Sequence, residues 1–290
     1  MTARGRGIAC IVISAFGFAL MAFFVRLCDD FGGNVSAFQK AFFRNVIAVA
    51  IAAAVFFRQG AQAGGVPVRA AWLPLAARCF FGSVGIFANF YALSFIPIGE
   101  AMTLNKTAPF FTVVFSWLIL RERASLRQIV FMAVAFSGAA LVMKPGFNES
   151  GSLAAILGLV GGLGAGAAYA SVRKLGLIGV DSAFIILVFS AFSTLASVPF
   201  MTGGFDPMTP AQVAIMLAAG ASAALGQFGV TLAYRYASPK SIAVYDYTNV
   251  IFTAVLGFCF FGQIPDLLSV AGFAVILFAA VGIGRARPAR

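Results

Sequence analysis

The chain has 290 residues, of which 61% are hydrophobic and only 10% charged, and its net charge is +11. Soluble proteins average roughly 45–50% apolar and about 25% charged residues. A soluble fold of this length has too little interior to hide so much apolar surface, so lipid must surround much of the chain. The absence of histidine excludes histidine-based triads, metal sites and proton relays.

The four cysteines are scattered along the chain and show no CxxC spacing. They therefore read as small apolar side chains and not as a disulfide or zinc framework. We expect no metal and no cofactor.

The sequence contains ten runs of about 20 mostly apolar residues, the length that crosses a bilayer as a helix. They are Gly7–Leu27, Ser36–Phe57, Trp72–Phe95, Ile98–Leu120, Leu126–Met143, Leu153–Val172, Ser182–Met201, Ala211–Tyr234, Ser241–Phe261 and Leu267–Ile283. The runs are continuously apolar and about twice strand length, which excludes a membrane barrel. The first is too long for a signal-peptide core and lacks a small-residue cleavage site. We predict an all-α polytopic membrane protein with ten transmembrane helices.

Lysine and arginine fall mainly in alternate breaks between these runs. With a cytoplasmic N-terminus, the inner segments hold Arg4, Arg6, Arg58, Arg69, Arg121, Arg123, Arg127, Arg173, Lys174, Arg235, Lys240, Arg285, Arg287 and Arg290, with Arg78 just inside its helix. The outer segments hold little beyond Arg26 and Lys144 and most of the acidic residues. By the positive-inside rule, we predict both termini in the cytoplasm and the chain in a bacterial inner membrane. The basic residues do not gather with stacking aromatics, so no nucleic-acid partner is expected.

A shift of 141 residues aligns the third to fifth runs with the eighth to tenth without gaps, and loops fall on loops. We therefore predict two five-helix repeats, residues 1–146 and 147–290. Because five is odd, the second repeat lies upside down relative to the first. Inverted repeats are common in secondary transporters, whose substrate site lies near the midplane between the halves. Plain duplication of a membrane scaffold is the alternative.

Charged side chains within apolar runs are costly and are functional candidates by default. Arg44, Lys106 and Asp246 lie one to two turns or more inside their runs. The repeat aligns Asn105-Lys106-Thr107 with Asp246-Tyr247-Thr248, and the inversion brings both triplets near the midplane. Arg44 and Lys106 would attract an anionic group, while Asp246 would bind an ammonium group or carry a coupling proton. The alternatives are an internal ion pair that fixes helix packing and, for Arg44, snorkelling.

Neutral polar residues form a second tier of substrate-binding candidates: Asn105, Asn89, Tyr245, Asn249, Gln227 and Tyr169. Each is equally able to bridge two helices. Pro109 should kink the fourth helix. Gly158, Gly162 and Gly166 form a small-residue face on the sixth helix, which indicates a close helix contact. We favour a contact within the chain, and a homodimer is the alternative.

These features together resemble the drug/metabolite transporter superfamily, in its ten-span form built from two EamA domains. The residues that carry the resemblance are Tyr91-Ala92-Leu93-Ser94-Phe95, Pro109, Arg121-Glu122, Ala233–Ala237 and Phe261-Gly262-Gln263. Gln263 departs from the glutamate common at that position. The resemblance implies transport of metabolites or drugs, and Lys106 is similar in placement to the anion-binding basic residue of the phosphate-exchanging relatives.

The leading hypothesis is a secondary transporter, an exporter or exchanger, for an organic anion or amino-acid-like zwitterion, working by alternating access. A cation or drug exporter using Asp246 is the alternative. An intramembrane aspartyl protease would need a second buried carboxylate, which the apolar runs lack. A channel would normally show rings of like residues. No phosphate-binding GxxxxGK[ST] motif supports ATP drive.

Overall fold

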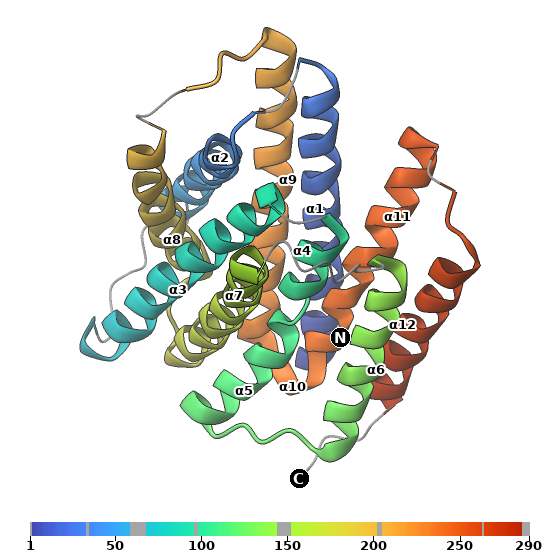
Figure 1. Ribbon diagram of the computed structural model, residues 1–290. Helices are drawn as coiled ribbons and strands as arrows, with labels where there is room; N and C mark the ends of the chain where they lie inside the picture. The colour runs from blue at the N-terminus through green and yellow to red at the C-terminus, as the bar shows by residue number, and fades with distance from the viewer. Residues whose placement is uncertain are drawn as a thin grey trace.

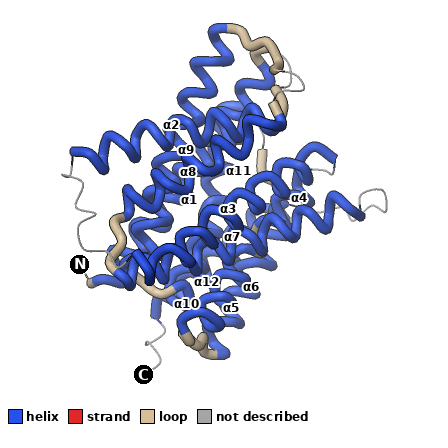
Figure 2. The backbone as a smooth tube through the Cα atoms, turned by 90° about the vertical axis from the view of Figure 1, so that its left-hand side faces the viewer, coloured by secondary structure: helices blue, strands red, loops and turns tan. Residues whose placement is uncertain are grey.

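The computed structural model describes residues 2–32, 35–58, 68–95, 98–143, 152–201, 205–262 and 264–285. Within these residues all regular structure is helical (Figure 2). The α-helices are α1 (Ala3–Asp30), α2 (Ala37–Arg58), α3 (Val68–Phe95), α4 (Ile98–Asn105), α5 (Ala108–Leu120), α6 (Leu126–Met143), α7 (Ser152–Ile178), α8 (Ser182–Ser197), α9 (Pro210–Tyr236), α10 (Pro239–Ile242), α11 (Thr248–Phe261) and α12 (Leu267–Arg285). Two 3-10 segments, η2 (Val198–Phe200) and η3 (Ala243–Tyr247), extend α8 and connect α10 to α11.

The ten predicted runs each correspond to one helix or to a pair of consecutive helices. Eight helical stretches are long and apolar enough to cross a membrane, and the shorter apolar helices α6 and α12 complete the ten. Large apolar side chains such as Leu126, Leu267 and Phe278 are exposed on their outer faces. Such surface requires lipid around it, which confirms the polytopic membrane fold.

The helices pack mainly in four pairs drawn from the two sequence halves (Figure 1). Helix α1 packs on α9, α3 on α7, α2 on α8, and α6 on α12. Exchanging the halves turns the first pair into the second and leaves the other two unchanged. Two repeats related by a two-fold axis would give this exchange symmetry, and the inversion of the second repeat stays a prediction. The division between 146 and 147 falls outside the described residues and stays a prediction.

The small-residue face of α7 packs within the chain, against the fourth membrane segment. A side chain at Gly166 would collide with Phe111 of α5, and one at Gly162 would meet Thr107 and lie 2.8 Å from the carbonyl oxygen of Leu104. The opposite face of α7 packs on α3, where an added Cβ at Gly85 would lie 3.0 Å from the amide of Ala165. The glycines therefore bring backbones close enough to place α7 between two neighbours.

The fourth and ninth membrane segments are broken, where the sequence predicted one kinked and one continuous helix. Helix α4 ends at Asn105 and α5 begins at Ala108, with Pro109 in its first turn. Proline lacks the amide hydrogen that an uninterrupted helix would need, but it fits the start of a new one. In the ninth segment, α10 leads into the tighter η3 before α11 begins. Both breaks fall on the aligned polar triplets.

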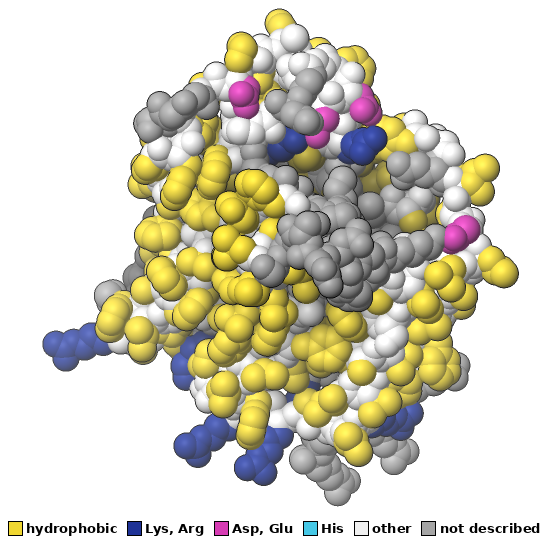
Figure 3. All heavy atoms as spheres, in the orientation of Figure 1, with side chains coloured by type: hydrophobic (Ala, Val, Ile, Leu, Met, Phe, Trp, Pro, Cys, Tyr) yellow, Lys and Arg dark blue, Asp and Glu magenta, His cyan; other side chains and the backbone are white. Residues whose placement is uncertain are grey.

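The molecule has a basic end and an acidic end. In Figure 3, acidic side chains lie toward the top, most of the basic ones toward the bottom, and apolar side chains between them. The start of α1 lies at the basic end, where Arg6 stacks on Tyr236 at 5.0 Å. The last turns of α12 lie there too, because Gly282 packs on Phe131 near the start of α6. Both described termini are therefore at the basic end.

Candidate functional site

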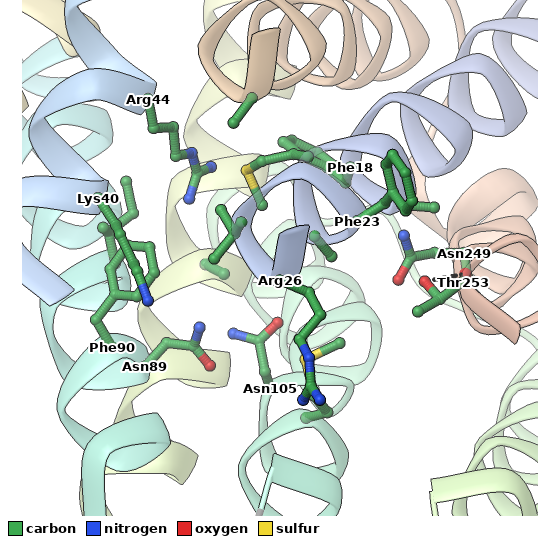
Figure 4. Close-up of a pocket in the computed structure, with 18 of the residues that line it drawn as sticks. Phe18, Phe23, Arg26, Lys40, Arg44, Asn89, Phe90, Asn105, Asn249 and Thr253 are labelled. Carbon is green, nitrogen blue, oxygen red and sulfur yellow. Dashed lines mark hydrogen bonds between the residues drawn. The ribbon is translucent and has the colours of Figure 1, made fainter. Parts of the chain in front are cut away.

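A cavity of about 950 Å³ extends from the acidic end into the middle of the helix assembly. Helices of both sequence halves line it. Arg26, Asp29, Lys40 and Asp206 lie at its rim, and Lys106, Tyr169 and Asp246 lie deeper. Figure 4 shows several of the lining side chains converging on this space from α1, α2, α3, α4 and α11.

Lys106 and Asp246 form an ion pair at the two helix breaks. The Lys106 Nζ lies 3.2 Å from Oδ2 of Asp246, and the two side chains are only 9% and 19% exposed. The hydroxyl of Tyr247 donates a hydrogen bond of 2.9 Å to the carbonyl oxygen of Lys106. The pair joins the two sequence halves, and the tyrosine satisfies a carbonyl at the break that would otherwise lack a partner.

Arg44 and Arg78 contribute two further positive charges to the cavity wall. The guanidinium of Arg78 stacks on the ring of Phe189 at 3.6 Å, and that of Arg44 lies 5.5 Å from the ring of Phe18. Neither has a carboxylate partner among the described residues. The Nε of Arg78 is buried and has no hydrogen-bond partner there. The cavity therefore contains two cations whose charge no described side chain balances.

Unlike Arg44 and Arg78, the charged side chains at the rim have polar partners among the described residues. The Nζ of Lys40 lies 2.8 Å from Oδ1 of Asp29. Asp206 accepts a hydrogen bond of 2.7 Å from the amide of Ser36. The sequence missed the rim as part of the cavity, because these residues lie in or beside different loops.

Most of the candidates from the sequence line this one cavity. They are Arg44, Asn89, Asn105, Lys106, Tyr169, Gln227, Asp246 and Asn249. Asn249 also bridges two helices, since its side-chain Nδ2 donates a hydrogen bond of 2.8 Å to the carbonyl oxygen of Ala15. The Oδ1 of Asn89 is buried without a hydrogen-bond partner in the described part of the chain.

The substrate-binding candidate Tyr245 is the exception, because it lies outside the cavity lining. It packs against the two hydrophobic clusters that contain Ile242 and Val244. In an α-helix, residues four apart are neighbours, which would place Tyr245 beside Asn249. Tyr245 lies in the 3-10 segment η3, where residues three apart align instead. Asp246 and Asn249, which are three apart, both line the cavity.

Arg78 lines the cavity but was not among the predicted site residues, because its position suggested a place just inside its helix at the basic end. The predicted span began at Trp72, which placed Arg78 near a helix end. Helix α3 begins at Val68, so Arg78 lies nearly three turns inside it and is 2% exposed. The signal that points to it is the general one: an arginine inside an apolar helix.

The basic end is closed by contacts between the halves and by further contacts within the second half. Glu122, in the α5–α6 loop, lies 2.9 Å from Nη2 of Arg173 on α7. The Nη1 of Arg173 donates hydrogen bonds of 3.3 Å to the carbonyl oxygens of Tyr234 and Arg235 at the end of α9. The Nζ of Lys240 also donates a hydrogen bond of 3.1 Å to the carbonyl oxygen of Arg123. Glu122 and Arg173 are outside the cavity lining, so the cavity reaches only the acidic end.

Residues 5–144 match the model of the EamA-like transporter family. The chain is 29% identical over 284 residues to the pseudopaline exporter CntI of Pseudomonas aeruginosa, covering 97% of this chain and 96% of the relative. Residues 5–144 therefore belong to the EamA-like transporter family, and the whole chain is similar to transporters of the drug/metabolite transporter superfamily. The chain is also 26% identical over 211 residues to the riboflavin transporter of Vibrio cholerae, covering 71% of this chain and 69% of the relative.

Two more distant similarities extend over nearly the whole transporter. Mouse solute carrier family 35 member G1 is 23% identical over 305 residues, covering 96% of this chain and 78% of the relative. A solved crystal structure shares the fold with a TM-score of 0.77 at 16% identity, over 93% of this chain and 95% of that one. The relatives are transporters of small molecules, which sets the intramembrane-enzyme alternative aside.

Proposed function

We propose that this transporter is a secondary exporter or exchanger of a small polar metabolite with anionic character, an organic anion or an amino-acid-like zwitterion. The observation that supports it is the charge of the cavity. Five cations and three carboxylates line it, and Arg44 and Arg78 have no acidic partner among the described residues. Uncompensated cations in a poorly solvated space favour an anionic ligand.

Transport proceeds by alternating access, with one half moving against the other around the Lys106–Asp246 pair. The cavity reaches the acidic end while Glu122 and Arg173 close the basic end. With the basic end in the cytoplasm of a bacterial cell, as the positive-inside rule predicts, this arrangement is the outward-facing state of an inner-membrane protein. Asp246 serves as the counter-charge and accepts the coupling proton when the pair separates.

The cation-exporter alternative is less well supported, because Asp246 is occupied. Its carboxylate already faces Lys106 at 3.2 Å. A cationic cargo would have to displace that lysine and also enter a cavity with surplus positive charge.

Counterflow in proteoliposomes tests the proposal. Vesicles loaded with unlabelled succinate, glutamate or choline are mixed with the labelled form of the same compound. We expect saturable, trans-stimulated uptake of succinate or glutamate and none of choline. Uptake that does not saturate would indicate a channel, and uptake of choline alone would favour the cation exporter.

A further inference from the structure

Arg78 is held as a binding group and not as a packing residue. Its guanidinium is stacked on Phe189, so one face is covered and its N–H groups lie around the edge. Gly82, one turn further along α3, leaves the space that the group occupies: an added Cβ would lie 2.5 Å from Nη1 and 2.6 Å from the Phe189 ring. A buried guanidinium with an unpartnered Nε is costly unless a ligand satisfies it.

Arg44 faces the same space from α2. Its guanidinium lies over Phe18 of α1 and points into the cavity (Figure 4). Arg44 and Arg78 line the same cavity, and the Arg78 guanidinium also lies 6.0 Å from the ring of Tyr169. Two like charges in one poorly solvated wall repel each other, so an anion bound between them removes a large unfavourable term.

Tyr169 lies beside Arg78 and lines the same cavity as the Lys106–Asp246 pair. The cavity wall thus has a neutral pole, Lys106 with Asp246, and a pole that carries two uncompensated positive charges. Arginine binds carboxylate in the plane of its fork through paired hydrogen bonds.

We propose that Arg44 and Arg78 form a carboxylate subsite distinct from the Lys106–Asp246 pair, and that the cargo class is a dicarboxylate with two net negative charges. This rests on the proposed function. One carboxylate would leave a residual positive charge in the wall. Two carboxylates balance both arginines, and the occupied site is then neutral as it crosses the low-dielectric region.

Thermal unfolding of the purified full-length transporter tests the subsite. The probes are succinate, propionate and choline at matched ionic strength, and the variants are Arg78→Gln, Arg44→Gln and Arg78→Lys. Arg127→Gln is the matched control, because Arg127 also stacks on a phenylalanine, at 5.6 Å, but lies outside the cavity. Ligand that binds the folded state raises the unfolding temperature.

We expect succinate to stabilise the wild type and Arg127→Gln, propionate to do so weakly, and choline not at all. Arg78→Gln and Arg44→Gln should weaken the apparent affinity for succinate at least about tenfold. Arg78→Lys keeps the charge without the fork and should fall between. If Arg78→Gln does not fold, Arg44→Gln and Arg78→Lys decide. Unchanged succinate binding in these variants, or equal effects of succinate and propionate, would overturn the inference.

Counterflow of the same probes separates this inference from the proposed function. Wild-type transport of anions with an unchanged preference for succinate over propionate in the Arg78 variants refutes the subsite and leaves the function standing. No carrier-mediated flux of any anion by the wild type refutes the function itself.

Discussion

Lys106 and Asp246 come from aligned triplets of the two sequence halves and meet at 3.2 Å in the middle of the molecule. A charged pair in this environment contributes little net stability, because both groups give up hydration. Removing one member is far worse than removing both, since it leaves the other charge unpaired. This asymmetry allows a structural role to be distinguished from a role in transport.

Lys106→Ala should abolish transport in proteoliposomes, because Asp246 loses the cation that opposes it. The double variant Lys106→Ala/Asp246→Ala should recover most of the lost thermal stability and remain inactive. Lys174→Ala, at the basic end and outside the cavity, is the control and should transport normally. Transport by the double variant at the wild-type rate would show that the pair only packs helices.

The helix breaks are the main structural feature at the scale of single elements. Each follows or contains a polar triplet, and each frees backbone groups that a continuous helix would bond internally. Tyr247 of η3 hydrogen-bonds the carbonyl of Lys106 at the other break. The two breaks therefore support each other, and helix α7, packed on α4 and α5, holds one of them in place.

Gly166→Leu should destabilise the protein, because the new side chain would collide with Phe111 of α5. Overpacking of this kind costs about 1–3 kcal/mol, and the displaced segment leads directly to Lys106. Thermal unfolding should show a lower midpoint, and transport should fall with it. Ala133→Leu on the exposed face of α6 is the control. Equal midpoints for the two variants would contradict the packing that places α5 against α7.

At the scale of the whole molecule, the two ends differ in charge and in closure. Glu122 and Arg173 join a loop of the first half to a helix of the second at the basic end. The aligned position of Glu122 in the second half is Gln263, which carries no charge and lies outside the described residues. Gln263 therefore cannot form the ion pair that Glu122 forms.

Glu122→Gln should loosen the basic end, since Arg173 loses its carboxylate partner. In a cysteine-free background, a single cysteine replacing the buried Thr112 should react faster with a thiol reagent applied from the basic side. Arg127→Gln in the same background provides the control. Labelling that stays at the control rate would show that this pair does not limit access.

The orientation of the molecule can be tested separately. Arg123 at the basic end and Phe205 at the acidic end are both exposed in the structure. Each is replaced by a single cysteine in a separate variant. In intact bacterial cells, an impermeant thiol reagent should label position 205 and not position 123. The opposite pattern would reverse the predicted topology and make the present state inward-facing.

The ten membrane segments, the asymmetry of charge and eight of the polar residues that line the cavity could be predicted from the sequence alone. These features depend on local composition, because the transfer of long apolar runs into lipid is favourable and every charge within them makes it less favourable. Local pattern also located the two polar triplets. It could not show that the segments carrying them break, since a proline or a 3-10 turn is compatible with a kink as well as with a break.

Which charges balance each other became known from the three-dimensional arrangement of the helices. Lys106 pairs with Asp246 and Lys40 pairs with Asp29, whereas Arg44 and Arg78 have no carboxylate partner among the described residues. The predicted run already placed Arg78 inside an apolar helix, but its full depth depends on where α3 begins, and the direction of the Tyr245 side chain depends on the pitch of η3. Pairing is a matter of distances between segments far apart in the chain, and electrostatic energy in a poorly solvated cavity depends on those distances and not on composition.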